Sequence, residues 1–213
     1  MDTSKEKIAG EMYFTANPNS EHHYQDFDFD LLGNHLRFTT DSGVFSKSTV
    51  DFGTRTMLNA LNKTTIISGK ILDLGTGYGP VGVAVAKYLQ QPVDMTDVNE
   101  RALALARKNA EQNGVIGLVN VFQSDIYANV SDKYALILAN PPIRAGKSVV
   151  TAMLQESIHY LLPGGKLIAV LQKKQGAPSA QKNMATVFGN VKVIHKDKGY
   201  YILESTYDPT TNV

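Results

Sequence analysis

The amino-acid sequence predicts an α/β protein built on a doubly wound, mostly parallel sheet of seven strands. From residue 70 onward, short apolar segments alternate with segments of helical periodicity in a regular order, which is the pattern of successive βα units. The last two apolar segments are separated only by Lys196-Asp-Lys-Gly199, a turn that suits a hairpin and is too short for a crossover. The last strand is therefore expected to run antiparallel to the others.

The alternating segments define the elements in order. Strands are expected at residues 71–74, 93–97, 119–123, 134–139 and 166–172, and the closing hairpin at 191–195 and 200–206. Helices are expected at 79–89, 99–112, 149–162 and 180–188. Asn99 is a favourable N-cap for the second of these helices, and Pro163-Gly-Gly165 is expected to stop the third.

The pattern before residue 70 differs and predicts an N-terminal cap of a β-hairpin and a helix. Residues 36–40 and 44–47 flank Asp41-Ser-Gly43, a hairpin signal, and residues 49–61 have helical periodicity. The acidic and aromatic segment 24–30 alternates in strand fashion, which is typical of a half-buried edge strand, with a binding face as the alternative. We expect one domain over residues 1–213, with the cap at 1–65 and the core at 66–213.

Composition excludes several classes of protein. Of the 213 residues, 43% are hydrophobic and 19% are charged, as in ordinary globular domains, and no apolar run is long enough to span a bilayer. The first residues lack the apolar stretch of a secretory signal, so the expected location is cytoplasmic. The absence of cysteine excludes disulfides and thiolate metal sites. The 5 histidines have no metal-binding spacing, so no metal is expected.

A glycine-rich turn, Asp73-Leu-Gly-Thr-Gly-Tyr-Gly79, follows the first strand of the core. Without side chains, its glycines let backbone amides approach a ligand at the strand end. The overlapping segment 77–82 also matches the dinucleotide fingerprint, and Asp97 lies 20 residues beyond Gly77, where that fingerprint has its ribose-binding acid. The turn therefore predicts a nucleotide-like cofactor without choosing between cofactors, and a purely structural tight turn is the alternative.

Acidic residues at the next two strand ends extend the expected cofactor site. Asp97 stands where the second strand gives way to a helix, so its carboxylate can accept two ribose hydroxyls. Asp94, inside the same strand, is the competing candidate. Asp125 occupies the matching position after the third strand and can accept an adenine amino group, with Ile126 against the ring. The alternative interpretation of Asp125 is a cap or turn aspartate.

The segment Asn140-Pro141-Pro142-Ile143 directly follows a buried strand and distinguishes between possible reactions. The Asn140 amide oxygen and the Pro141 carbonyl, held by two successive proline rings, form two acceptors that can face one amino group. An exocyclic amine on a base is a poor nucleophile because its lone pair is delocalised into the ring. Two acceptors that draw on its N–H bonds localise that pair toward an incoming methyl group. Together with the glycine turn, the motif predicts methyl transfer to an amino group, although two prolines in a turn are otherwise common.

With these motifs, the chain resembles the class I S-adenosylmethionine-dependent methyltransferases, specifically the small-domain group similar to the bacterial 16S ribosomal RNA guanine-N2 methyltransferases. The resemblance extends to Gly43-Val-Phe-Ser-Lys47 and Val50-Asp-Phe-Gly-Thr54 in the cap. It implies a Rossmann-like methyltransferase fold with S-adenosylmethionine as cofactor. The cofactor-binding residues that it implies are Asp51, Asp73, Gly75, Thr76, Gly77, Gly79, Asp97, Val98, Asp125 and Ile126. The catalytic residues that it implies are Asn140, Pro141 and Pro142.

The substrate-binding residues are expected to combine apolar and basic side chains. They are Phe45, Ile143, Arg144, Lys173 and Lys174. Related enzymes acting on adenine or glutamine usually carry an aromatic residue where this chain has Ile143, so stacking on the target is expected from Phe45 or Tyr78. Residues 131–213 carry 10 Lys/Arg against 5 Asp/Glu, and the loop 172–178 leaves its strand at the edge where Asn140 lies. Its lysines predict contact with RNA phosphate, with a solvated loop as the alternative.

The favoured function is methylation of the exocyclic N2 amine of a guanine in the ribosomal RNA of the small subunit, with the RNA or the small ribosomal subunit as partner. One alternative is another amino-group methyltransferase, acting on adenine N6, protein glutamine or a small amine. A second is an NAD-binding oxidoreductase, and a third is a cofactor-binding adaptor without activity. The larger ribosomal enzymes of this group carry an additional N-terminal domain, for which this chain is too short.

Overall fold

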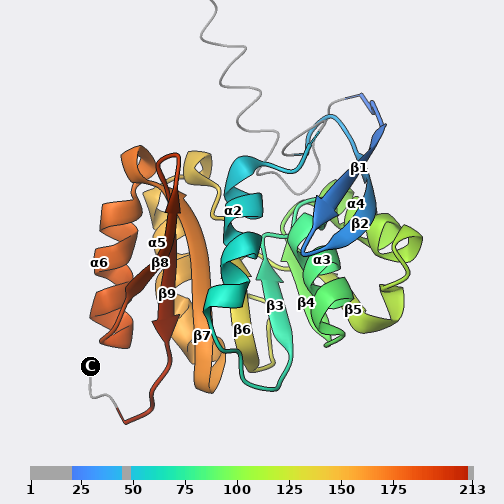
Figure 1. Ribbon diagram of the computed structural model, residues 1–213. Coiled ribbons are helices and arrows are strands. Elements are labelled where there is room, and N and C mark those ends of the chain that lie inside the picture. The colour runs from blue at the N-terminus through green and yellow to red at the C-terminus, as the bar shows by residue number, and fades with distance from the viewer. Residues whose placement is uncertain (1–20, 45–48, 211–213) are drawn as a thin grey trace, which may run out of the picture.

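The computed structural model describes residues 21–44 and 49–210, and its centre is a seven-stranded sheet with the order β5-β4-β3-β6-β7-β9-β8 (Figure 1). The strands are β3 (Ile71–Leu74), β4 (Val93–Asp97), β5 (Val119–Gln123), β6 (Tyr134–Ala139), β7 (Leu161–Gln172), β8 (Lys192–Asp197) and β9 (Tyr200–Thr206). All neighbours pair in parallel except that β9, the last strand of the chain, runs antiparallel to both β7 and β8. The predicted fold class is confirmed.

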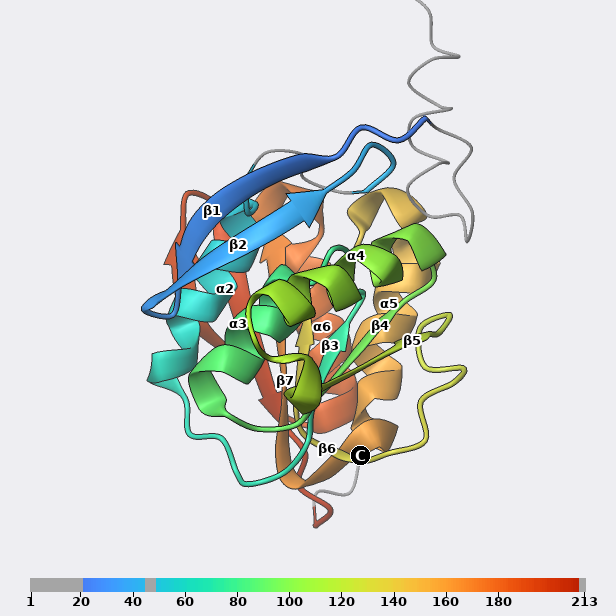
Figure 2. The ribbon, with the colours of Figure 1, turned by 90° about the vertical axis from the view of Figure 1, so that its right-hand side faces the viewer.

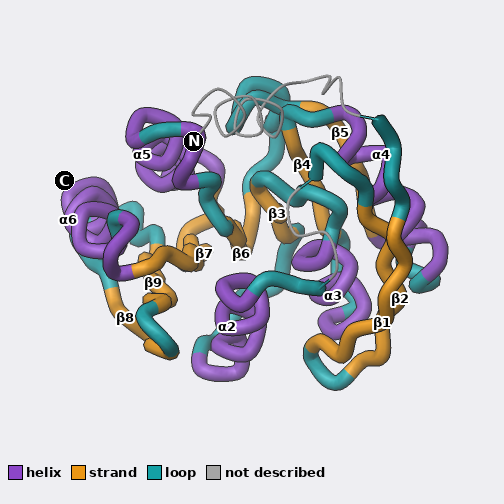
Figure 3. Tube along the Cα trace, turned by 90° about the horizontal axis from the view of Figure 1, so that it is seen from above, coloured by secondary structure: helices purple, strands orange, loops and turns teal. Residues whose placement is uncertain are grey.

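Helices cover both faces of the sheet (Figures 1 and 3). One face carries α2 (Phe52–Ala60), α3 (Pro80–Leu89) and α4 (Glu100–Gln112), and the other carries α5 (Lys147–Gln155) and α6 (Ala177–Phe188). Strand residues alternate between the two faces, as the period of two requires. Leu136 and Leu138 pack in the cluster with α2, α3 and α4, whereas Ile137 packs in the cluster with α5 and α6. Short 3₁₀ segments lie at Leu61–Lys63, Ile116–Leu118, Ile143–Ala145, Glu156–Tyr160 and Lys173–Gln175.

The N-terminal hairpin forms at a different turn from the predicted one. It consists of β1 (Gln25–Leu31) and β2 (Asn34–Thr40), which lie outside α3 and α4 (Figure 2). The turn is Leu32-Gly33, where φ is +50° and +76°, the left-handed pair that a two-residue hairpin needs. The Asp41-Ser-Gly43 turn follows β2 instead, and the strand expected at 44–47 lies outside the described residues apart from Val44. The expected edge strand in segment 24–30 is confirmed as β1.

The boundary between the third helix of the core and its following strand also differs from the prediction. The helix expected to end at residue 162 ends at Gln155, and β7 begins at Leu161, so Pro163-Gly-Gly165 lies inside the strand. The β6–β7 register shifts there. Gly164 has φ +80°, and a Cβ on Gly165 would lie 2.7 Å from the Tyr134 carbonyl oxygen. The two glycines therefore form a β-bulge and do not stop a helix.

One buried side chain ties the hairpin to the rest of the molecule. Asn109 of α4 has no exposed surface. Its Oδ1 accepts from the backbone amide of Thr39 at 2.8 Å, and its Nδ2 donates to the carbonyls of Thr39 at 3.0 Å and of Tyr78 at 2.7 Å. The hairpin and the glycine turn thus share one polar centre. On this basis we propose that the cap and the core form a single domain.

No helix in the described part of the chain has the length and apolar character needed to cross a membrane.

Candidate active site

The topology brings the two sequence motifs to one edge of the sheet. In the sheet, β4 and then β5 lie on one side of β3, whereas β6 and then β7 lie on its other side. The gap between β3 and β6 is therefore the topological switch point, where open α/β sheets bind ligands at the carboxyl ends of their strands. Leu74, the last residue of β3, pairs with Ala139, the last residue of β6. The glycine turn and Asn140 follow these paired residues directly, about one strand spacing of 4.8 Å apart.

The glycine turn is fixed to the neighbouring strand by its own backbone. The amides of Gly75 and Thr76 both donate to the Thr96 carbonyl, at 2.9 and 2.8 Å. Gly77 has φ +57°, and nothing lies within 4 Å of the place where a Cβ would stand. The turn therefore presents an open backbone surface at this position, as a cofactor that approaches the main chain requires.

Two glycines of the same segment serve packing of α3 against β4. A Cβ on Gly79 would lie 2.9 Å from Cε of Met95, and one on Gly82 would lie 2.6 Å from its Cγ. Both positions thus let the helix approach the strand closely. The structural interpretation therefore applies to Gly79 and Gly82, and ligand binding beside Gly77 stays a prediction.

Asp73 lies beneath the turn, 3% exposed. Its Oδ2 accepts from the Thr76 hydroxyl at 2.5 Å and from the Gly82 amide at 2.8 Å, which joins the turn to α3. Burial raises the pKa of this carboxyl to about 7, against the hydrogen bonds from Thr76 and Gly82 that lower it. A contact of Asp73 with the cofactor stays a prediction.

The raised pKa of Asp73 gives a signed pH dependence. An aspartate ordinarily has a pKa of 3.8, and in the folded chain the pKa of Asp73 is about 7, so between these values the folded chain binds more protons at Asp73 than the unfolded chain does. The contribution of Asp73 to the free energy of unfolding is therefore largest below pH 3.8 and falls as the pH rises through 7. Asp73→Asn cannot titrate. Urea unfolding of both proteins from acid to neutral pH is expected to show the wild type losing stability relative to the variant; parallel profiles would contradict the assignment.

Asp97 and Asp94 occupy different surroundings. Asp97 accepts the Gly77 amide on Oδ2 and the Asn99 amide on Oδ1, both at 2.9 Å, and burial raises its pKa. Asp94 accepts instead from the Tyr134 hydroxyl at 2.7 Å and from Lys70 at 3.3 Å, inside the sheet. The geometry favours Asp97 as the residue that faces a ligand. Val98 follows it and is half-buried.

Asp125 and Ile126 line a cavity of about 310 Å³ together with Glu156 and Tyr160. The Asp125 side chain is exposed, and Ile126 takes φ +50°, an uncommon conformation for a β-branched residue. Tyr127, also in this lining, stacks on Tyr160 with ring centroids 4.4 Å apart. The loop after β5 is thus held in a defined conformation beside the strand ends, and an adenine contact there stays a prediction.

Asn140 is oriented by two side chains at the start of α2. Its Nδ2 donates to Oδ1 of Asp51 at 3.2 Å and to the hydroxyl of Thr54 at 3.1 Å. In the described part of the chain, no donor contacts its Oδ1. The Pro142 carbonyl accepts the Ala145 amide at 2.9 Å, whereas no described donor contacts the Pro141 carbonyl. The two acceptors expected from the sequence are therefore the two that remain available.

The structure separates the expected substrate residues. Phe45 lies outside the described residues. Tyr78 is wrong as a stacking residue because it is 3% exposed and packs edge-on against Phe38, with ring centroids 5.8 Å apart. Ile143 is half-buried in the 3₁₀ segment after the prolines.

The basic residues predicted to contact substrate are exposed on two loops. Arg144 belongs to the 3₁₀ segment after the prolines, and Lys173 and Lys174 follow β7. The Lys173 amide donates to the Gly199 carbonyl at 2.8 Å. This bond joins the lysine loop to the β8–β9 hairpin at the carboxyl edge.

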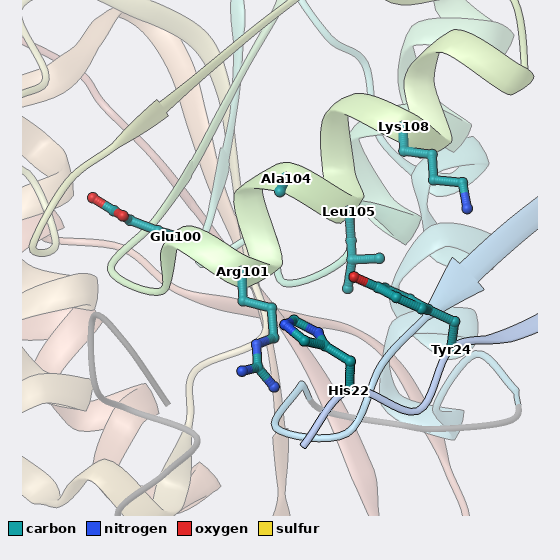
Figure 4. A pocket seen from close by; sticks show the side chains of 7 residues that line it. All are labelled: His22, Tyr24, Glu100, Arg101, Ala104, Leu105 and Lys108. Atoms are coloured by element: carbon teal, nitrogen blue, oxygen red, sulfur yellow. The ribbon is translucent and has the colours of Figure 1, made fainter. Parts of the chain in front are cut away.

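A larger cavity, of about 540 Å³, contains none of the predicted site residues (Figure 4). Its lining is His22, Tyr24, Glu100, Arg101, Ala104, Leu105 and Lys108. Arg101 donates to the Ser42 carbonyl at 2.9 Å, and the Lys108 ammonium stands 5.8 Å from the Tyr24 ring centroid. These cations therefore hold the hairpin region to α4. In the residues that the structure describes, no group of three metal-ligating side chains is found.

Comparison with known proteins places this geometry in a family. Residues 35–204 match the family model described as the methyltransferase small domain. The chain belongs to this family. It is an S-adenosylmethionine-dependent methyltransferase, and the oxidoreductase alternative is set aside. Within the family, it is 44% identical over 198 residues to YbxB of Bacillus subtilis, an uncharacterised protein, and the match covers 92% of this chain and 98% of that one.

Other members are longer. Ribosomal RNA small subunit methyltransferase C of Vibrio vulnificus is 30% identical over 190 residues, which cover 86% of this chain and 53% of that protein. The chain thus spans about half the length of this relative. The 16S rRNA N2 methyltransferase of T. thermophilus, solved in complex with AdoMet and guanosine, superposes with a TM-score of 0.78 at 23% identity, covering 89% of this chain and 52% of that one. This likeness shows the shared methyltransferase fold.

Sequence reasoning missed Thr54, which contacts Asn140 across 86 positions of the chain. The available signal was the spacing of Asp51 and Thr54, which matches an N-cap bonded to the backbone amide three residues later. That signal predicts the start of α2 but not the contact with Asn140.

Proposed function

We propose that this methyltransferase acts on the exocyclic N2 amine of a guanine in the ribosomal RNA of the small subunit. The single observation that carries the proposal is the orientation of Asn140. Its Nδ2 is engaged by Asp51 and Thr54, so its Oδ1 is the end left to accept from an amino group at the carboxyl edge. The Pro141 carbonyl supplies the second acceptor.

The relatives support the substrate class. Proteins named ribosomal RNA small subunit methyltransferase C share about 30% identity with the chain, and the T. thermophilus enzyme was solved with guanosine. A guanine N2 amine has two N–H bonds in the plane of the ring, which suits two acceptors on adjacent residues. An unpaired guanine is favoured because extracting a paired base costs a few kcal/mol.

The residues of the chain then act in sequence. The glycine turn, with Asp97, holds the cofactor, whose sulfonium supplies an activated methyl group. Asn140 Oδ1 and the Pro141 carbonyl accept the two amine protons in hydrogen bonds and turn the nitrogen lone pair toward that methyl. The N–C bond forms as the S–C bond breaks, and the methylated nitrogen loses one proton to water. No general base is needed, because the positively charged product amine is acidic.

The cofactor residues fit S-adenosylmethionine in charge and shape. Gly77 offers open space beside its backbone, and the carboxylate of Asp97 lies within 2.9 Å of the same residue's amide. A carboxylate at the end of β4 suits two ribose hydroxyls, and the exposed Asp125 suits the adenine amine. We therefore keep Gly75, Gly77, Asp97 and Asp125 as the proposed cofactor contacts.

The test is methyl transfer from labelled S-adenosylmethionine to small ribosomal subunits and to their naked RNA, followed by nucleoside analysis. Label in N2-methylguanosine supports the proposal. Label in N6-methyladenosine, or in protein, would show that the methylated group is not a guanine amine, while the assignment as an amino-group methyltransferase would stand. Absence of label in RNA and protein, with cofactor bound, would overturn the ribosomal assignment.

Basic residues at the same edge are proposed to contact RNA phosphate. Replacing both Lys173 and Lys174 with alanine is expected to weaken RNA binding and to reduce the slope of log K against log salt by about 1 to 2, since each neutralised phosphate contributes about 0.7 to 0.9. Filter binding at several salt concentrations measures the slope. Lys133 directly precedes β6 and Lys192 begins β8, both at the amino edge of the sheet, so their double alanine variant is the charge-matched control. Equal slopes in the two variants would contradict the assignment.

A further inference from the structure

The Asn140 amide is held by groups that belong to the N-terminal cap. Asp51 is the N-cap of α2, and its Oδ1 accepts both the Thr54 backbone amide, at 3.0 Å, and Asn140 Nδ2, at 3.2 Å. The Thr54 hydroxyl accepts the same nitrogen at 3.1 Å. Two oxygens, one from each end of the first turn of α2, therefore face one NH₂ group; we call this pair the Asp51–Thr54 bracket.

We propose that Asp51 and Thr54 are positioning residues that fix and polarise the Asn140 amide for catalysis. This inference rests on the proposed function of Asn140. It differs from the cofactor-binding role that the resemblance implies for Asp51, because the side chain that the structure places against this carboxylate is Asn140.

The chemistry of the two acceptors determines which way the amide points. An amide can rotate by half a turn with little change in shape, and only its neighbours distinguish its oxygen from its nitrogen. A rotated Asn140 would bring its oxygen against the Asp51 carboxylate, where two acceptors repel. The bracket thus keeps Nδ2 toward α2 and Oδ1 toward the substrate.

The carboxylate also strengthens the acceptor. When an amide N–H donates to a charged oxygen, electron density within that amide shifts from its nitrogen to its carbonyl oxygen. Linked hydrogen bonds polarise one another in this way. Oδ1 of Asn140 therefore becomes a better acceptor for the target amine than an isolated asparagine would be. The gain is greatest as positive charge develops on the amine nitrogen.

The bracket is itself rigid. Thr54 is 2% exposed, and a Cβ on Gly53 would lie 3.0 Å from Cε1 of Tyr200 and 3.1 Å from Oδ1 of Asp51. Gly53 thus allows the Tyr200 ring of β9 and the Asp51 carboxylate to lie close together. The helix that carries the bracket packs on β7, β8 and β9, so its position relative to Asn140 is set by the sheet.

Kinetics of Thr54 variants test the inference. Thr54→Val keeps the shape and removes the acceptor, and is expected to lower kcat about 10-fold or more with the cofactor Kd unchanged. Thr54→Ser restores the hydroxyl and is expected to recover kcat to within about threefold. Thr56→Val is the matched control, because Thr56 is a buried threonine of the same helix whose hydroxyl donates back to the Phe52 carbonyl at 2.7 Å. It is expected to keep the wild-type kcat.

A double-mutant cycle separates positioning from general stability. If Thr54 acts through Asn140, Thr54→Val in an Asn140→Ala background has no further effect on kcat. An additional loss of the same size in that background, or an equal loss in Thr56→Val, would overturn the inference.

A measurement without substrate distinguishes this inference from the proposed function. The side-chain NH₂ signals of Asn140 in ¹⁵N NMR spectra are identified by their loss in Asn140→Ala. Thr54→Val and Asp51→Ser are expected to shift these signals, and Thr56→Val is not; Asp51→Ser retains an N-cap but is too short to reach the amide. Shifted signals without RNA methylation would contradict the proposed substrate and leave the bracket supported. Unshifted signals would overturn the bracket, whatever the substrate.

Discussion

Asn140→Ala is expected to lower kcat for methyl transfer by two or more orders of magnitude while the Kd for S-adenosylmethionine changes by less than about twofold. The variant removes an acceptor that acts on the amine as charge develops, and loss of one oriented group of this kind typically costs about 10²- to 10³-fold. The proposed cofactor contacts lie at the ends of β3, β4 and β5, so the substitution leaves them unchanged. Single-turnover kinetics measure the chemical step, and calorimetry measures cofactor affinity.

The matched control for this prediction is Asn62→Ala. Asn62 is an exposed asparagine in the 3₁₀ segment after α2, and its variant is expected to keep the wild-type rate. A loss of cofactor binding in Asn140→Ala equal to its loss of rate would contradict a transition-state role and assign Asn140 to the cofactor. A wild-type protein that binds cofactor and methylates no acceptor would favour the adaptor alternative.

Asp97→Ala is expected to raise the Kd for S-adenosylmethionine by about 100-fold or more. Two hydrogen bonds from ribose hydroxyls to a charged oxygen contribute about 1.5 to 3 kcal/mol each, and each ~1.4 kcal/mol corresponds to tenfold in affinity. The variant also frees the Gly77 amide, which now donates to Asp97 at 2.9 Å. Calorimetry with the cofactor and with S-adenosylhomocysteine measures the loss, which should be of similar size for both ligands because they share the ribose.

Asp94→Ala is the control for Asp97. Asp94 bonds to Tyr134 and Lys70 inside the sheet, so its loss is expected to lower the free energy of unfolding and to leave the cofactor Kd of the folded protein nearly unchanged. If Asp94→Ala raised the Kd for the cofactor as much as Asp97→Ala, the choice of Asp97 over Asp94 as the ribose-binding residue would be wrong.

Local sequence patterns predicted most strands of the core at their observed boundaries. The strands at 93–97, 119–123 and 134–139 agree because each is a short apolar or alternating run with polar neighbours, and that information lies within the run itself. The hairpin turn was misplaced because Asp41-Ser-Gly43 carries a stronger turn signal than Leu32-Gly33, although only the latter places Leu36 and Phe38 on the inner face opposite their β1 partners. The turn at Leu32-Gly33 depends on the packing of β2 on α3 and α4, which no local pattern encodes.

Parallel topology explains how much of the candidate site could be predicted. Asp97, Asp125 and Asn140 each follow a strand, and parallel strands bring their carboxyl ends to one edge whatever the details of packing. The position of α2 has no such rule. Asp51 and Asn140 are 89 residues apart, and their contact depends on how the cap helix packs across β7 and β9. The same lack of local information applies to Tyr78, whose burial against Phe38 required knowing where the hairpin lies.

The hydrogen bonds of Asn109 limit how far the chain can be shortened at its N-terminal side. A chain shortened to begin near Lys70 would keep every motif that follows, yet it would remove Thr39 from the Asn109 amide and Phe38 from the ring of Tyr78. The loss would appear at Tyr78, beside Gly77, as a loosened glycine turn, because Asn109 would lose both of its hydrogen bonds to Thr39 and the Tyr78 ring would lose its contact with Phe38. A fusion of residues 70–210 with another recognition domain should therefore keep the hairpin. Although the hairpin lies far from the glycine turn along the chain, it contacts that turn through Asn109 and Tyr78.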